Sequence, residues 1–166
     1  MRRGESWLSK RIAWVIILLI LQAQTKVSKV PIMRTTVTPY LTVSPAEDAI
    51  AFYIKVFKAK EVVRRMADDG KRVMHCELTI AEGTVMLADA FPEHGGPVSP
   101  VAGALSSVTI NLDMARPSDI DASAARALGS GAIIEMKPHD TFWGTRFAKF
   151  RDPFGHRWMM NAPLET

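Results

Sequence analysis

The sequence has one cysteine, Cys76, among its 166 residues. A single thiol cannot form an internal disulfide, so the disulfide framework that supports many small secreted domains is excluded. Two catalytic signatures are also missing: there is no serine or cysteine in a nucleophile elbow, and no glycine-rich phosphate loop. The sequence therefore gives no support to hydrolysis by an elbow nucleophile or to P-loop nucleotide chemistry.

Positive charge is scarce outside the first 34 residues. The chain carries 21 Lys and Arg against 17 Asp and Glu, but residues 1–34 hold seven of the basic residues and only one acid, Glu5. The remainder has 14 basic and 16 acidic residues, a net charge of −2. We predict no nucleic-acid partner, because such binding needs a clustered excess of positive charge.

The chain also lacks a long hydrophobic run. The apolar stretch at residues 12–21 has ten residues, whereas a membrane-spanning helix needs about 20. Because basic residues precede it, residues 1–24 resemble a secretory signal that would export or tether the protein. The alternative is a spurious upstream extension of a cytoplasmic protein that starts at Met33. The body, which reads as a reduced cytoplasmic domain, favours that alternative, and either way residues 1–34 are excluded from the fold.

Alternating and helical patterns fill the rest of the chain. Residues 35–43 alternate as a half-buried strand, and Ser44-Pro45-Ala46-Glu47 predicts a capped helix start, with Ser44 as the N-cap. The pattern predicts a helix over residues 45–57, followed by strands over 61–66, 72–80 and 84–90. Residues 91–104, with three prolines and three glycines, read as a linker.

The same order then returns. We predict a strand over residues 106–113, a helix over 117–128 capped near Ser118, and strands over 132–137, 142–151 and 156–162. Asp152-Pro153-Phe154-Gly155 reads as the tight turn between the last two strands. The sequence therefore predicts an α+β fold of two β-α-β-β-β modules, about residues 35–90 and 106–163, within one domain over 35–166. Two such sheets brought together would form a polar-lined cup.

Several short motifs in this order resemble the vicinal oxygen chelate superfamily, which contains glyoxalase I, bleomycin-resistance proteins and extradiol dioxygenases. They are Pro39-Tyr40-Leu41, Ala49-Ile50-Ala51-Phe52-Tyr53, Met74-His75-Cys76-Glu77-Leu78, Thr141-Phe142-Trp143-Gly144 and Asp152-Pro153-Phe154-Gly155 with Trp158-Met159. Within it, the chain is most similar to the PhnB-like group. The resemblance implies a glyoxalase-like fold with sheets curved into a cup, and a homodimer.

The resemblance also implies where a metal would be held, one position on the first and last strand of each module. The corresponding positions in this chain are Thr38, Leu87, Ser107 and Met159. None is a usual ligand for a divalent metal of that kind, since Met suits soft metals only. We therefore expect no metal cofactor.

Candidate site residues come from the polar faces of the predicted strands. His75 and Glu77 are two apart, so they share a face and are candidates for acid–base chemistry or for a polar cross-strand pair. Tyr40 and Asn111 are candidate ligand contacts, or a solvated sheet end and a solvated face. Trp143 would supply an aromatic wall or a core contact. Arg157 would hold a carboxylate or phosphate, or form a structural ion pair.

Two functional hypotheses follow. The first is metal-independent binding or sequestration of a small molecule in the polar cup. The second is a glyoxalase- or dioxygenase-type lyase or isomerase acting on a small oxygenated metabolite, with His75 and Glu77 in acid–base roles or holding a divalent metal.

Overall fold

The structure, a computed structural model, describes residues 36–100 and 107–165. The predicted leader lies outside these residues. No helix within the described ranges is long and apolar enough to cross a membrane.

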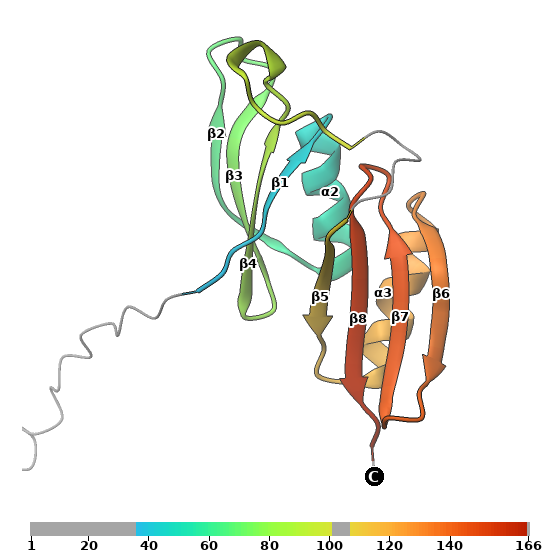
Figure 1. Cartoon of the computed structure of the whole chain (residues 1–166). Helices are drawn as coiled ribbons and strands as arrows, with labels where there is room; N and C mark the ends of the chain where they lie inside the picture. Colours follow the sequence, from blue (N-terminus) through green and yellow to red (C-terminus); the bar gives the residue numbers. More distant parts are fainter. Residues whose placement is uncertain (1–35, 101–106, 166) are drawn as a thin grey trace, which may run out of the picture. The chain divides into compact units, whose positions relative to one another are not determined.

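The first module is a four-stranded sheet with one helix (Figure 1). Its elements are β1 (Tyr40–Val43), α2 (Ala46–Phe57), β2 (Lys60–Met66), β3 (Val73–Ile80) and β4 (Gly83–Asp89). The strand order is β1-β4-β3-β2. β1 runs parallel to β4, and the other neighbouring strands are antiparallel. Hairpins join β2, β3 and β4, whereas the helical crossover through α2 leaves β1 running in the same direction as β4.

The second module repeats this topology. After the short 3-10 helix η1 (Pro92–His94) come β5 (Thr109–Asp113), α3 (Pro117–Leu128), β6 (Ile133–Asp140), β7 (Thr145–Arg151) and β8 (Arg157–Pro163). The strand order β5-β8-β7-β6 matches that of the first sheet. The predicted α+β fold of two β-α-β-β-β modules is confirmed, with the strands in two separately hydrogen-bonded sheets.

Strand boundaries differ from the prediction where turn chemistry intervenes. Phe142 and Trp143, expected in a strand, lie in the turn between β6 and β7. The turn closes because the backbone N–H of Thr141 donates to the carbonyl of Thr145 at 2.8 Å. Gly144 adopts a φ of +87°, which side chains disfavour.

The predicted helix caps were wrong. Pro45, not Ser44, is the N-cap of α2, and no cap side chain hydrogen-bonds to the helix. Instead the buried Asp89, at the end of β4, accepts hydrogen bonds from the backbone N–H of Ala46 at 2.8 Å and of Val73 at 2.7 Å. Asp89, 43 positions after Ala46, thus accepts the hydrogen bond that a local cap residue was expected to accept.

The start of α3 also differs. Arg116 is the N-cap residue and Pro117 opens the helix. Ser118, the expected cap, is therefore inside the first turn. Arg116 pairs instead with Asp119, at 3.0 Å between Nη2 and Oδ1.

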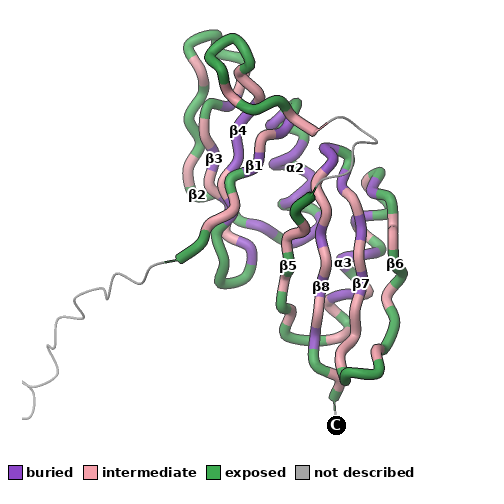
Figure 2. Tube along the Cα trace, viewed as in Figure 1, coloured by how far each residue is buried: buried purple, intermediate pink, exposed green. Residues whose placement is uncertain are grey.

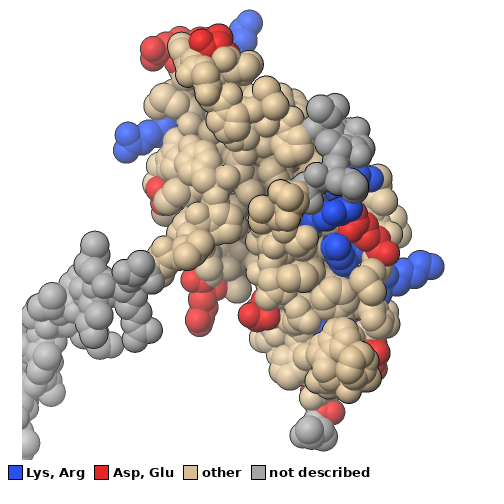
Figure 3. All heavy atoms as spheres, in the orientation of Figure 1, with Lys and Arg blue, Asp and Glu red and all other residues tan. Residues whose placement is uncertain are grey.

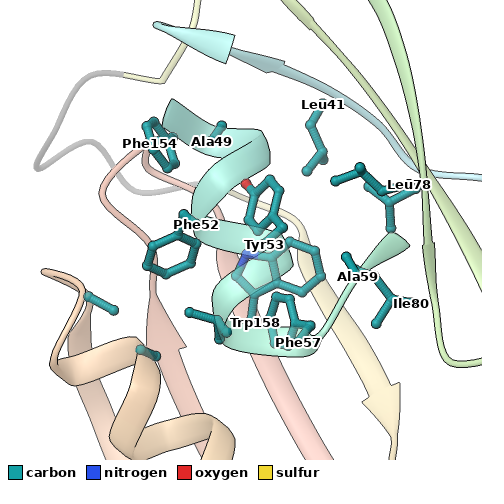
Figure 4. Packing of buried hydrophobic residues seen from close by; sticks show 14 of the residues in the cluster. Leu41, Ala49, Phe52, Tyr53, Phe57, Ala59, Leu78, Ile80, Phe154 and Trp158 are labelled. Atoms are coloured by element: carbon teal, nitrogen blue, oxygen red, sulfur yellow. The ribbon is translucent and has the colours of Figure 1, made fainter. Parts of the chain in front are cut away.

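Helix α2 lies in the centre of the core (Figure 4). Seven of its residues are buried: Ala46, Ala49, Ile50, Phe52, Tyr53, Val56 and Phe57. One side packs on its own sheet, and the other carries rings into the second module, where Tyr53 and Phe57 lie 5.2 and 4.7 Å from the ring of Trp158. The tube in Figure 2 shows this burial along α2. The aromatic stripe predicted for this helix therefore packs against both modules.

A buried carboxylate fastens this contact. Asp152 accepts hydrogen bonds from the Tyr53 hydroxyl at 2.7 Å and the Trp158 indole N–H at 2.8 Å. It also accepts from the backbone N–H groups of Phe154 and His156. Burial and the nearby Asp152 charge raise the pKa of Tyr53 well above its ordinary value, so this hydroxyl remains a donor. The predicted tight turn thus joins the two modules.

Candidate functional site

Each sheet has one face against the core and one face without a covering helix. We call the second of these the open face of each sheet. The residues of this face alternate with buried residues along a strand, or pair across strands with residues that do so. On the first sheet they are Tyr40, Thr42, Val63, Arg65, His75, Glu77, Thr79, Thr84 and Met86. On the second sheet they are Thr109, Asn111, Asp113, Phe147, Lys149, Arg151, Arg157, Met159 and Asn161.

Three predicted site residues form a hydrogen-bonded chain on the first open face. The Tyr40 hydroxyl lies 3.1 Å from Nδ1 of His75, and Nε2 of His75 lies 3.1 Å from Oε1 of Glu77. Tyr40 and Glu77 both pair with Met86 of the intervening strand β4. Because alternate strand residues share a face, this register places β1 and β3 side chains within reach of one another.

The chemistry of the groups orients this chain. A carboxylate oxygen only accepts, so Nε2 of His75 donates to Glu77. When the imidazole is neutral, Nδ1 then accepts a hydrogen bond from the Tyr40 hydroxyl. Burial, followed by the Cys76 thiol, raises the pKa of Tyr40 above its ordinary value, which keeps its hydroxyl protonated. The arrangement can deliver a proton to, or take one from, a group bound at Tyr40 or His75.

Tyr40 also borders an open hollow of about 570 Å³ that reaches Asn111 of β5. Its lining is Val37, Pro39, Tyr40, Leu41, Pro100, Val108, Thr109, Ile110, Asn111 and His156. Within this lining, no side chain is Lys, Arg, Asp or Glu. Asn111 accepts from Nδ2 of Asn161 at 2.7 Å and donates to Asp113 at 3.0 Å.

Arg157 lies on the second open face, beside Thr109 of β5. Its Nε donates to Oε1 of Glu135 at 2.9 Å, and Nζ of Lys149 lies 3.4 Å from Oε2 of the same carboxylate. Arg157 and Glu135 are each 21% exposed at the side chain. Both readings offered by the sequence therefore stay open, since the ion pair is present and the guanidinium is partly accessible.

Trp143 does not join the other predicted site residues. It sits in the β6–β7 turn, 55% exposed, with its ring 4.8 Å from that of Phe142 and 6.3 Å from that of Phe147. The six predicted site residues thus do not form one cluster. Tyr40, His75 and Glu77 lie together, and Asn111 shares the hollow with Tyr40. Arg157 and Trp143 lie at separate places on the second module.

The metal positions implied by the resemblance do not form a ligand set. Leu87 is fully buried on the core side of β4, and its neighbours in the strand are Met86 and the buried Ala88. Thr38 and Ser107 precede their strands, and Met159 lies on the second open face. Among the described residues, no group of three or more His, Cys, Asp or Glu side chains is placed to hold a metal ion. None of the four positions implied by the resemblance supplies a His, Gln or Glu donor.

Sequence reasoning missed two groups of functional interest. Glu135 and Lys149 were not singled out, although alternation along residues 132–137 and 142–151 offered a signal for their face. Glu135 and Lys149 contact each other because the β6–β7 register shifts between Ile134 and Met136, as in a β-bulge. The position of such a bulge cannot be predicted from the sequence of one strand alone.

Comparison with known proteins agrees with this architecture. The family model described as the Glyoxalase/Bleomycin resistance protein/Dioxygenase superfamily matches residues 33–160. The uncharacterized protein Mb0911c of Mycobacterium bovis is 38% identical over 134 residues, which cover 80% of this chain and 86% of that protein.

Two solved structures share the fold. Protein PA1353 from Pseudomonas aeruginosa superposes with a TM-score of 0.64 at 21% identity, covering 80% of this chain and 100% of that one. TioX from Micromonospora sp. ML1 superposes with a TM-score of 0.60 at 25% identity, covering 79% and 100%. On the family match and the sequence identity together, the chain belongs to the glyoxalase/bleomycin resistance protein/dioxygenase superfamily.

Proposed function

We propose that this protein binds or sequesters a small organic molecule, without a metal, in the hollow between Tyr40 and Asn111. The observation that carries the proposal is the lining of that hollow. Apolar side chains provide most of it, and Tyr40, Thr109, Asn111 and His156 add polar groups. A concave apolar surface with a few polar groups is typical of small-molecule sites, and this lining suits an uncharged, largely apolar ligand body.

Tyr40 is the residue that links the hollow to the rest of the first open face. Its hydroxyl is held by His75, which is held in turn by Glu77. A preorganised donor costs less entropy on binding than a freely rotating one. Tyr40 and Asn111 would contact the ligand directly, and His75 and Glu77 would position Tyr40.

Metal independence is supported by the side chains at the family's metal positions. These positions hold Thr38, Leu87, Ser107 and Met159, whereas divalent metals in such sites take His, Glu or similar donors. His75 and Glu77 together supply two donors, fewer than the three protein ligands of a catalytic zinc site.

A second candidate function is a lyase or isomerase of the same superfamily. The Tyr40–His75–Glu77 chain favours it, because a carboxylate that orients an imidazole beside a hydroxyl is suited to general acid–base catalysis. In this role His75 would transfer the proton and Glu77 would stabilise the imidazolium.

Ligand screening by thermal unfolding tests the binding proposal. A panel of small oxygenated metabolites and aromatic compounds is added to the full chain, and each hit is repeated with Tyr40→Phe, His75→Ala and Glu77→Ala. Arg65→Gln, an exposed change on the same face, is the matched control. We expect the hits to weaken in the first three variants and not in the control. Hits unaffected by all three would contradict the site, and a stoichiometric tightly held metal would contradict metal independence.

We further propose that the protein is a PhnB-like homodimer. Support comes from the resemblance and from large apolar residues exposed on or beside the second open face, such as Ile133 and Met136, which are 56% and 44% exposed. Light scattering of the purified full chain gives the molar mass directly, and a monomer at all concentrations would overturn this part.

A further inference from the structure

The second open face has a row of charges that the binding proposal leaves unused. Antiparallel pairing places Arg151 of β7 directly opposite Arg157 of β8. On the other side of Arg157 the row continues with Thr109 of β5, and beyond Arg151 with Ile133 of β6. The next row holds Lys149 beside Met159.

This arrangement brings two cations to one carboxylate and leaves a third cation beside them. Glu135 bonds to Arg157 and lies 3.4 Å from Lys149. Arg151 has no side-chain hydrogen bond or ion pair with any residue that the structure describes. Asp152 follows Arg151 in the chain, but its two oxygens are taken by four donors in the core. Lys149, Arg151, Arg157 and Glu135 together carry a formal charge of +2.

Like charges directly opposite on neighbouring strands destabilise a sheet, because their Cβ atoms are only about 4.5–5.5 Å apart. Here the two arginines are also only half-exposed, so water screens them less than at an open surface. Figure 3, in the orientation of Figure 1, shows Lys and Arg atoms gathered around Asp and Glu atoms over the β8–β7–β6 part of this face. An anion between the arginines would relieve the repulsion.

We propose that Arg151 and Arg157, assisted by Lys149 and the Thr109 hydroxyl, bind an oxyanion group of a small molecule, a carboxylate or a phosphate or phosphonate. A planar guanidinium recognises two oxygens of such a group at once. Glu135 holds Arg157 and Lys149 in place and competes with the anion for them. This inference deepens the proposed binding function and rests on it, since it assigns an acidic group to the class of ligand.

The test uses inorganic phosphate and acetate as probes on the full chain. Thermal unfolding is followed against probe concentration, with chloride added to equal ionic strength. A ligand that binds only the folded state raises the midpoint with the logarithm of its concentration above Kd. We expect a logarithmic rise of the midpoint with phosphate that exceeds the change with chloride, and the stronger of the two probes identifies the source of the oxyanion.

Variants make the test specific. Arg151→Gln should raise the phosphate concentration needed for a given shift by about tenfold or more, the scale of one charge-assisted hydrogen bond. Glu135→Gln should lower that concentration, because the internal competitor is gone. Arg65→Gln, which removes one exposed cation from the other sheet, should leave it unchanged.

An equal shift with chloride would overturn the inference. So would an Arg65→Gln effect as large as that of Arg151→Gln, and loss of the dimer rather than of the phosphate response in Arg151→Gln. The last would assign the face to contact between copies. A ligand hit that needs Tyr40 but not Arg151 would overturn the anion site and leave the proposed function standing. If the phosphate response is kept in Tyr40→Phe and the screen gives no ligand hits, the proposed function is overturned and the anion site stands.

Discussion

The first module buries seven residues of its helix α2, while the second buries four of α3, namely Ile120, Ser123, Ala124 and Ala127. The difference follows from position, because α2 contacts both its own sheet and the second module. Small residues on α3 let it lie close to β6, β7 and β8. The two modules share one topology, but their helices differ in position: α2 packs in the core between both modules, and α3 packs on the second sheet alone.

The open faces differ as well. The first presents a hydroxyl–imidazole pair backed by one carboxylate, and the second presents a cationic row around Glu135. The buried acids show the same division. Asp89 bonds only within the first module, whereas Asp152 bonds across both.

Asp152→Ala tests the link between modules and should have the largest effect. It leaves four donors, three of them buried, without an acceptor, so we expect a loss of about 3–5 kcal/mol in the free energy of unfolding. Urea denaturation measures this. Asp140→Ala, which removes an exposed partner of Arg146, should cost less than about 0.5 kcal/mol. A loss below about 1 kcal/mol in Asp152→Ala would contradict the conclusion that this carboxylate links the two modules.

Asp89→Ala removes the acceptor that serves the first module alone. Two backbone donors, at Ala46 and Val73, lose their partner, for an expected loss of about 2 kcal/mol. The same denaturation series ranks it against Asp152→Ala. If Asp89→Ala proved the more costly of the two, the carboxylate within the module would matter more than the one between modules.

Alkaline pH should weaken the contact made by Tyr53. Its pKa is raised well above 10 in the folded chain, so above about pH 10 the unfolded tyrosine loses its proton while the folded one keeps it. Stability contributed by this group is present below the unfolded pKa and falls by about 1.4 kcal/mol per pH unit above it. Tyr53→Phe should show a flatter fall between pH 9 and pH 11. Parallel curves would contradict the buried, neutral phenol.

Arg126 provides a weaker link between the helices. Its guanidinium donates to the carbonyl of Val56, near the end of α2, at 2.7 and 2.9 Å. Arg126→Met removes a cation from a helix C-terminus, and we expect a loss of about 1 kcal/mol. Arg116→Met, which removes an exposed pair within α3, is the control and should change stability by less than half as much.

Tyr40→Phe should have the smallest effect on stability, at most about 0.5 kcal/mol, because Tyr40 is 53% exposed. Its effect belongs to ligand binding instead. Equilibrium unfolding beside the ligand screen separates the two. A loss as large as that of Asp89→Ala would make the Tyr40–His75–Glu77 chain a structural element of the first sheet.

Local patterns alone determined much of this protein. Alternation and helical spacing predicted both modules, their order and the extent of α2 and α3 to within a residue. The sharing of a face by His75 and Glu77 also followed from strand periodicity, since residues two apart in a strand point the same way. The turn at Asp152-Pro153-Phe154-Gly155 was predicted from Pro and Gly chemistry, but not the role of its carboxylate.

Tertiary structure decided everything that depends on partners far apart in the chain. Asp89 replaced the local cap of α2, and Asp152 met Tyr53 across 99 positions. Register placed Tyr40 against His75 and Arg151 against Arg157, while Trp143 went to an exposed turn. Strand periodicity fixes which face a side chain takes, but only the pairing of strands fixes its neighbours. The sites proposed here arise from those neighbours.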